Sequence, residues 1–120
     1  MGTDESRLNV TPQGDATVVE LTDSKILDEV TISQIGEQLN GLAQQSDRPK
    51  IVLDFAQVSH MSYSALGMLI TLHKRVREKN GQLRFCNIQP TIYEVFVITR
   101  LNEIFEIRSS RQEALHGLVS

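Results

Sequence analysis

Residues 50–55, with the sequence Lys-Ile-Val-Leu-Asp-Phe, constrain the fold more than any other part of the chain. Their apolar side chains follow one another without the alternation of a half-exposed strand, which is typical of a strand covered on both faces. Such strands lie in the middle of parallel sheets that have helices packed against them. We therefore predict that residues 50–55 form the central strand of an α/β sheet.

An amphipathic helix is predicted on each side of this strand. Over residues 28–43 the apolar positions recur at steps of three and four residues, the pattern of a helix with one face on a core. Residues 64–79 repeat the pattern, and Asn80-Gly81 after them is a typical helix stop. The chain therefore places a helix before and after its most apolar strand.

Shorter elements complete the chain. We predict a hairpin from strands at 8–10 and 16–21, later strands at 82–86 and 104–107, and helices over 90–98 and 111–118, the last capped by Ser109 or Ser110. The order β-β-α-β-α-β-α-β-α predicts an α/β fold with a mixed, mostly parallel sheet of about five strands and helices packed against it. With 120 residues, one domain at 8–120 after a flexible tail at 1–7 is expected.

The charge and hydropathy of the chain exclude several classes of protein. A net charge of −3 argues against direct binding of nucleic acid, whose partners carry basic surfaces. No apolar run approaches the roughly 20 residues that span a bilayer, and the polar start is unlike a secretory signal, so we expect no membrane insertion and a cytoplasmic location. Four basic residues lie near the end of the second predicted helix: Lys74, Arg75, Arg77 and Lys79. Their positive charge stabilises the negative end of the helix dipole. A binding patch is the alternative interpretation.

Motifs of catalysis and of cofactor binding were not found. The sequence has no glycine-rich phosphate loop and no metal-ligand spacing, and the histidines His60, His73 and His116 are isolated. The single Cys86 sits among apolar residues and is expected to pack as a small hydrophobic side chain. We therefore predict no metal, no cofactor and no enzymatic activity.

The segment 59–67, Ser-His-Met-Ser-Tyr-Ser-Ala-Leu-Gly, carries the functional signal. It follows the central strand and opens the second helix, and the carboxyl edge of parallel strands is where ligands and partners bind. A phosphate on Ser64 would meet the free N–H groups and the positive dipole end of that helix. An N-cap role for Ser62 or Ser64 explains the same serines, so the residues alone leave a switch and a cap both open.

This segment resembles the signature of the STAS domain of anti-anti-sigma factors, and the similarity runs over residues 8–120. The family pattern has Val, two or three spacers, and Asp-Ser-Ser-Gly-Leu-Gly opening a helix. Here Val58 matches the Val, and Met-Ser-Tyr-Ser-Ala-Leu-Gly at 61–67 stands where a hydrophobic residue and that motif would be. Leu27-Asp28 stands where the family has Gly-x-Leu-Asp. Ser64 therefore matches the serine that is phosphorylated in the family.

The resemblance implies an anti-sigma factor antagonist with Ser64 as phosphoacceptor. The unmodified protein would bind an anti-sigma factor of the serine kinase type, phosphorylation would abolish that binding, and a separate phosphatase would reset the switch. Ser62, Tyr63 and Ala65 depart from the Asp, Ser and Gly of the family motif, which removes a charge beside the phosphoacceptor but keeps the hydroxyl. The expected partner-binding residues are Asp28, Ser59, Ser62, Tyr63, Ala65, Leu66 and Met68.

Two other functions are compatible with the sequence. A constitutive STAS adaptor or scaffold subunit, in a transporter accessory or sensory complex, would use the same surface without phosphate control, and the altered motif favours it. Nucleotide binding or hydrolysis by the domain has little support without a phosphate loop. The sequence leaves the identity of the partner and the oligomeric state open, a homodimer included.

Overall fold

A computed structural model describes residues 7–118 of the chain. The predicted tail at residues 1–6 lies outside the described residues. Arg7, which the sequence analysis assigned to the tail, is bound to the domain: its backbone N–H donates to Gln38 Oε1 at 3.0 Å and its guanidinium pairs with Asp23 at 2.9 Å. Arg7 is therefore part of the domain.

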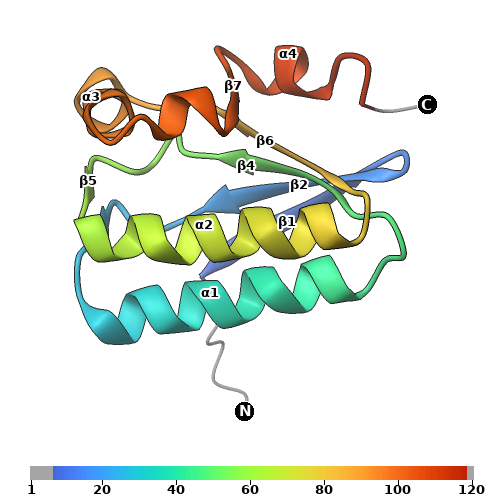
Figure 1. The fold of residues 1–120 in the computed structure, drawn as a ribbon, viewed down its shortest axis with the longest axis horizontal. Coiled ribbons are helices and arrows are strands. Elements are labelled where there is room, and N and C mark those ends of the chain that lie inside the picture. Colours follow the sequence, from blue (N-terminus) through green and yellow to red (C-terminus); the bar gives the residue numbers. More distant parts are fainter. Residues whose placement is uncertain (1–6, 119–120) are drawn as a thin grey trace.

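Five strands form the main sheet in the order β1-β2-β4-β6-β7. β1 (Leu8–Gln13) pairs antiparallel with β2 (Ala16–Leu21), and every other neighbouring pair is parallel. β4 (Lys50–Asp54) lies in the middle between β2 and β6 (Gln82–Cys86), while β7 (Glu106–Arg108) forms the far edge (Figure 1). The mixed, mostly parallel sheet and its central strand are confirmed.

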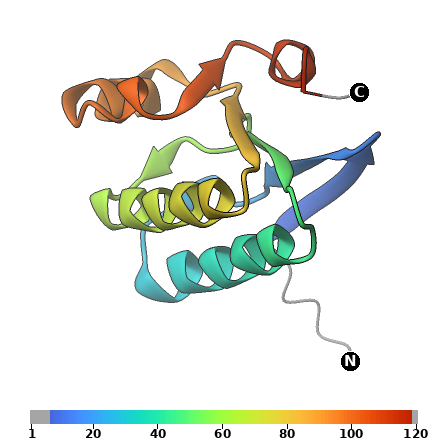
Figure 2. The ribbon, with the colours of Figure 1, turned by 45° about the vertical axis from the view of Figure 1, so that its right-hand side comes forward.

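The helices lie on both faces of this sheet. α1 (Glu29–Gln44) and α2 (Tyr63–Glu78) run side by side and in the same direction on one face, and the short α4 (Arg111–Leu115) covers the other (Figure 1, Figure 2). α3 (Pro90–Ile98) and a 3₁₀ turn (Leu101–Glu103) connect β6 to β7. The predicted helix boundaries are correct to one residue, except that α4 ends at Leu115 rather than at residue 118.

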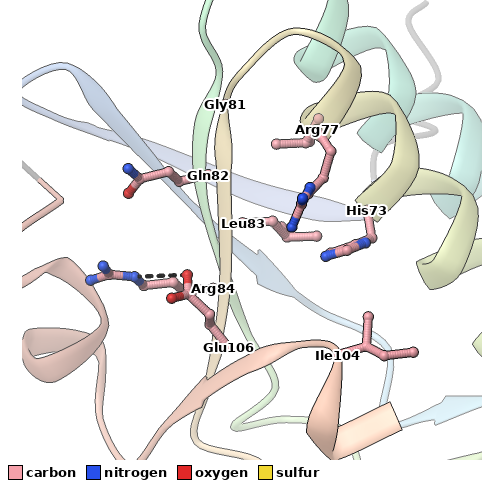
Figure 3. A pocket seen from close by; sticks show the side chains of 9 residues that line it. His73, Arg77, Gly81, Gln82, Leu83, Arg84, Ile104 and Glu106 are labelled. Carbon is pink, nitrogen blue, oxygen red and sulfur yellow. Dashed lines mark hydrogen bonds and ion pairs between the residues drawn. The ribbon is translucent and has the colours of Figure 1, made fainter.

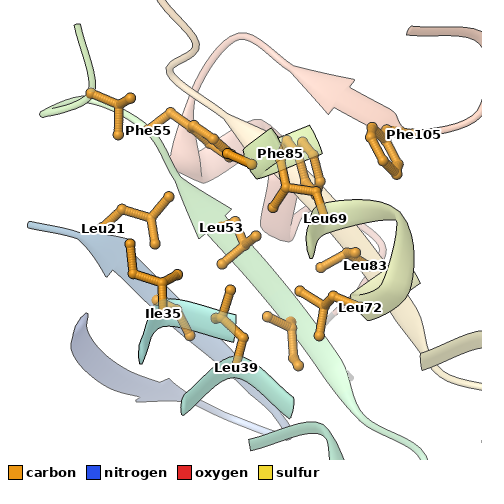
Figure 4. Packing of buried hydrophobic residues seen from close by; sticks show 14 of the residues in the cluster. Leu21, Ile35, Leu39, Leu53, Phe55, Leu69, Leu72, Leu83, Phe85 and Phe105 are labelled. Atoms are coloured by element: carbon orange, nitrogen blue, oxygen red, sulfur yellow. The ribbon is translucent and has the colours of Figure 1, made fainter. Parts of the chain in front are cut away.

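Two apolar clusters, one on each face of the sheet, explain the apolar run in β4. Leu53 belongs to the large cluster under α1 and α2, with Leu39 and Leu69 from those helices (Figure 4). Val52, its neighbour in the strand, points to the other face and packs in a smaller cluster with Ala114 of α4. Successive strand residues point to opposite faces, so a strand buried on both sides needs apolar residues at consecutive positions.

The four phenylalanines of the chain gather at one place in the large cluster. The ring centroids of Phe85 and Phe105 are 4.7 Å apart, and those of Phe55 and Phe85 are 5.3 Å apart. Phe96 of α3 contacts all three at 5.9–6.4 Å. Aromatic packing therefore holds α3 and the chain before β7 against the ends of β4 and β6.

The structure corrects two predicted boundaries. The strand predicted at 104–107 begins at Glu106, because Arg100 in the left-handed region (φ 63°) starts a 3₁₀ turn that the sequence analysis missed. The first strand is longer than the predicted 8–10, since β1 continues through Pro12 to Gln13. The hairpin turn is therefore only Gly14 and the residue after it, with Gly14 supplying the positive φ of 65° that a tight turn needs.

Candidate functional site

Two short strands that the sequence did not predict shape the segment 59–67. β3 (Lys25–Ile26) and β5 (His60–Met61) pair in parallel as a separate two-stranded sheet. The backbone N–H of Ser62 extends this pairing by donating to the carbonyl of Ile26 at 3.0 Å. The chain continues from the ends of these strands into α1 and α2, so the two helix N-termini are fixed side by side.

The N-terminus of α1 is capped by Asp28. One carboxylate oxygen accepts the backbone N–H of Thr31 at 3.0 Å, and the other accepts the Thr31 hydroxyl at 2.7 Å. These bonds, the hydroxyl first, hold the pKa of Asp28 below its ordinary value. Asp28 therefore presents a negative charge at an exposed position, and the same carboxylate caps the N-terminus of α1.

The N-terminus of α2 has no such cap. Ser62 occupies the N-cap position with extended backbone angles (φ −81°, ψ 163°), but its side chain makes no capping hydrogen bond. Its Oγ is buried and has no hydrogen-bond partner among residues 7–118. Two serines were predicted as possible N-caps. Ser62 occupies the N-cap position but makes no capping hydrogen bond, and Ser64 lies inside the first turn of the helix. The start of α2 therefore has donor groups that no side chain of the described residues accepts.

Tyr63 and Ser64 are the outward residues of this helix start. Tyr63 is 65% exposed, and Ser64 is exposed with no side-chain hydrogen bond to the described part of the chain. Ser59, one strand earlier, is half-buried and donates its hydroxyl to the carbonyl of Ser24 at 3.1 Å. The hydroxyl of Ser64 is therefore free to react, whereas that of Ser59 is engaged.

Three other predicted partner-binding residues face inward. Ala65 and Leu66 are 0% and 4% exposed and belong to the large apolar cluster. Met68 is half-buried between the helices, where a Cβ added to Gly36 of α1 would lie 3.0 Å from Met68 Cγ. These side chains position α2 on the sheet and on α1, so the exposed residues among the predicted contacts are Asp28 and Tyr63.

Sequence reasoning missed two apolar residues at this surface. Leu27 and Val30 are 51% and 62% exposed and flank the Asp28 cap. Val30 stands off the buried stripe of α1, and an apolar residue off the stripe is the signal that could have identified it, whereas Leu27 precedes the helix and has no such signal. We refer to the exposed set as the Ser64 surface. It consists of Leu27, Asp28, Val30, Tyr63 and Ser64.

Gly67, one turn after Ser64, adds to this surface. A Cβ at Gly67 would meet no atom within 4 Å, so no contact in the described structure requires glycine there. Glycine inside a helix costs about 0.5–1 kcal/mol relative to alanine. Because Gly67 has no side chain, the exposed face of α2 beside Ser64 leaves room for the close approach of another molecule.

Asp54, at the end of β4, fixes the loop that leads into the segment 59–67. This carboxylate is 3% exposed at the end of β4, and one oxygen accepts the backbone N–H of Ala56 at 2.9 Å and the side-chain amide of Asn87 at 3.0 Å. The other oxygen accepts two bonds from Arg111 of α4, at 2.7 and 3.0 Å. Asp54 thereby ties the loop that leads to Ser59 to the loop after β6 and to α4.

A cavity of about 290 Å³ lies at the other end of α2, between that helix, β6 and the chain before β7 (Figure 3). Burial, followed by the charge of Arg77, lowers the pKa of His73 in its wall. Arg84 in the same wall is engaged by Glu106 at 3.4 Å. None of the predicted partner-binding residues lines this cavity, so it is separate from the Ser64 surface.

The other candidate chemical groups lie apart from the Ser64 surface or are closed to solvent. Cys86 is fully buried under α4, and burial raises the pKa of its thiol to about 12, as expected for a packed, unreactive cysteine. Within residues 7–118 no cluster of three His, Cys, Asp or Glu side chains is placed to hold a metal ion. Over the same residues, no helix has both the length and the apolar character needed to cross a bilayer.

Comparison with known proteins gives consistent matches. The sequence profile of the STAS domain family matches residues 7–114. A protein of Bordetella bronchiseptica assigned as an anti-sigma factor antagonist, BtrV, is 33% identical over 91 residues, covering 73% of this chain and 78% of BtrV. The structure of an anti-sigma factor antagonist (STAS) domain protein from Planctomyces limnophilus superposes with a TM-score of 0.85 at 25% identity, covering 94% of this chain and 98% of that chain.

A more distant structural match extends the comparison. The Bacillus cell fate determinant SpoIIAA in its phosphorylated form superposes with a TM-score of 0.69 at 18% identity, covering 92% of this chain and 97% of that chain. At that identity the likeness concerns the fold alone.

Proposed function

The chain belongs to the STAS domain family, and on this basis we propose that it is an anti-sigma factor antagonist controlled by phosphorylation of Ser64. In this proposal the unmodified protein binds an anti-sigma factor of the serine kinase type through the Ser64 surface, and a phosphatase restores it after phosphorylation. Its effect on transcription is indirect. It acts as a regulatory binding protein in the cytoplasm and not as an enzyme.

The observation that carries the proposal is the position of Ser64. Its hydroxyl is exposed in the first turn of α2, the helix whose N-terminus no side chain caps. Free backbone N–H groups and the positive end of the helix dipole stabilise a phosphate at such a position. A phosphate on Ser64 is therefore compatible with the folded domain.

The same position explains how a phosphate would release a partner. Tyr63, the neighbour of Ser64 in the chain, and Val30 in the first turn of α1 offer exposed apolar area of the kind that is buried at the centre of an interface. A phosphate adds about two negative charges, and Asp28 already supplies one at the neighbouring helix end. Burying these charges together against a partner is unfavourable, so the phosphorylated protein is expected to dissociate.

The departures from the family motif are compatible with this role. Ala65 is buried inside α2, where alanine favours the helix more than the family's glycine does. Tyr63 points to solvent and enlarges the apolar part of the surface. Ser62 replaces a charged residue at the N-cap, so the kinase would recognise a helix start without that charge.

The test combines phosphorylation with binding. The purified protein is incubated with ATP and the cognate anti-sigma kinase, and intact-mass and peptide mass spectrometry locate any added phosphate. Calorimetry then compares kinase binding by the wild type, Ser64→Ala and Ser64→Asp. Thr71→Asp, on the exposed face of the same helix two turns later, is the matched control for an added charge. The proposal expects phosphate on Ser64 alone and loss of binding in Ser64→Asp only.

A second function, the constitutive STAS adaptor, is favoured by one observation. The family aspartate is Ser62 here, and the side chain of Ser62 makes no bond at the start of α2. If the protein is an adaptor, the Ser64→Asp variant should still bind the partner, and the wild type should carry no phosphate after incubation with kinase and ATP. These two results together would contradict the phosphorylation switch and support the adaptor function.

A further inference from the structure

The charges on α1 and α2 are segregated. α1 carries Glu29 and Glu37 and no basic residue, whereas the last turns of α2 carry Lys74, Arg75 and Arg77, with Glu78 the acidic residue of that helix. None of these six side chains forms an ion pair with another described residue. Their charges are therefore available to another molecule.

The fold places these charges at opposite corners of one surface. α1 and α2 lie side by side and run in the same direction, so the N-terminal half of α1 and the C-terminal end of α2 are diagonal to each other (Figure 1). A shallow groove of about 470 Å³ follows α1 and includes Glu29 and Glu37. A second groove, of about 230 Å³, follows α2 and is lined by Lys74 and Arg75 together with Glu78, so that two basic side chains face one acidic side chain there. We call these pairs of side chains the acidic corner and the basic corner, and the exposed face of the two helices the helix layer.

We propose that the helix layer binds the helix layer of a second copy of this chain, with each acidic corner against the other copy's basic corner. Both complementary surfaces are present on this chain, which favours a second copy over an unrelated acidic partner. A two-fold axis in the plane of contact, perpendicular to the line that joins the corners, forms both charge contacts at once. The exposed Val30, Tyr63 and Ile70 lie within the covered area.

The size of the helix layer makes this association weak. Each helix has 16 residues and is therefore about 24 Å long, and two packed helices are about 20 Å wide. The flat outline of about 480 Å² per copy is small beside the roughly 800 Å² of accessible surface that each partner buries in a standard stable complex. The dimer is expected to be reversible and salt-sensitive, because exposed charge pairs are screened by ions. It also covers Ser64, so self-association and partner binding exclude each other. The inference goes beyond the proposed function and does not depend on it.

Sedimentation velocity on the purified chain tests the proposal. At about 20 mM NaCl, the mass should rise from monomer toward dimer between about 10 and about 500 µM protein, and about 500 mM NaCl should return it to monomer. The double variants Glu29→Lys/Glu37→Lys and Lys74→Glu/Arg75→Glu should each associate at least about tenfold more weakly. An equimolar mixture of the two should form a heterodimer, since one layer is then basic and the other acidic. Glu94→Lys, at an exposed position of α3 outside the helix layer, is the control for a changed charge and should behave as the wild type.

Three results would overturn the proposal. A wild type that is monomeric at every concentration and salt excludes the dimer, whether or not Ser64 is phosphorylated by the kinase. A dimer that neither double variant weakens places the interface elsewhere. A mixture of the two double variants that stays monomeric excludes the corner-to-corner contact. If the wild type is monomeric and Lys74→Glu/Arg75→Glu instead weakens binding to the anti-sigma kinase, the basic corner belongs to that partner.

Discussion

Replacing Arg111 by methionine should destabilise the domain by breaking the clamp between α4 and the central strand. Arg111 donates two bonds, of 2.7 and 3.0 Å, to a carboxylate oxygen of Asp54, whose side chain is 4% exposed. Methionine keeps much of the apolar stem but removes both donors. The buried Asp54 carboxyl group would keep only the Ala56 N–H and the Asn87 amide as donors.

The size of the effect follows from the burial of the two partners. Removing one member of a fully buried ion pair costs about 3–5 kcal/mol, since the other charge stays behind. The side chain of Arg111 is 40% exposed, so water can reach the vacated position and reduce the loss. We expect the free energy of unfolding to fall by about 2–3 kcal/mol. In a domain of this length, that lowers the melting temperature by about 8–12 °C.

Urea unfolding followed by circular dichroism measures this loss, and a double-mutant cycle isolates the pair. Asp54→Asn keeps the shape of the side chain and removes its charge. The double variant Asp54→Asn/Arg111→Met should therefore be about 1–2 kcal/mol more stable than the sum of the single losses predicts. A single Arg111→Met loss below about 0.5 kcal/mol, or strictly additive losses, would refute the view that the pair clamps α4.

Three further predictions concern individual residues. Gly67→Ala and Gly41→Ala, both in open space on exposed helix faces, should each stabilise the fold by about 0.5–1 kcal/mol in urea unfolding, but only Gly67→Ala should weaken kinase binding in calorimetry. Thr31→Val should raise the pKa of Asp28 toward its ordinary 3.8 in an NMR titration. Because that pKa is lowered in the fold, Asp28 stabilises the wild type above about pH 4 and loses this effect as the pH falls through the lowered value, and an unchanged pKa in the variant would contradict the assignment. Cys86 should resist thiol reagents at pH 8 until urea unfolds the chain, and rapid labelling of the native protein would contradict its burial.

The parts of the fold that the sequence predicted are those with a long periodic or unbroken apolar pattern. The central strand and helices α1 and α2 extend over enough residues for burial on one or both faces to leave a clear pattern. The strands at 25–26 and 60–61 have two residues each, which is too short for any periodicity, although their pairing sets the positions of both helix N-termini.

The site was predicted less completely than the fold. The bond between Asp54 and Arg111 joins residues 57 positions apart, and no local pattern reveals such a contact. The inward orientation of Ala65 and Leu66 was readable, because they stand four and three residues before the buried Leu69 on the same face of α2. The motif resemblance selected them as contact residues, whereas helix geometry places their side chains in the core.

The proline in β1 determines where the sheet stops. Gln13 and Ala16 flank a two-residue turn and form a hydrogen-bonded pair, so the next pair, Pro12 and Thr17, directs its backbone groups away from the partner strand. Proline has no N–H on that outer side, so β1 offers one hydrogen-bond donor fewer to a strand of another chain that approaches this edge. The edge is thus protected against the strand-by-strand growth that begins aggregation, and the antiparallel hairpin ends the sheet on that side.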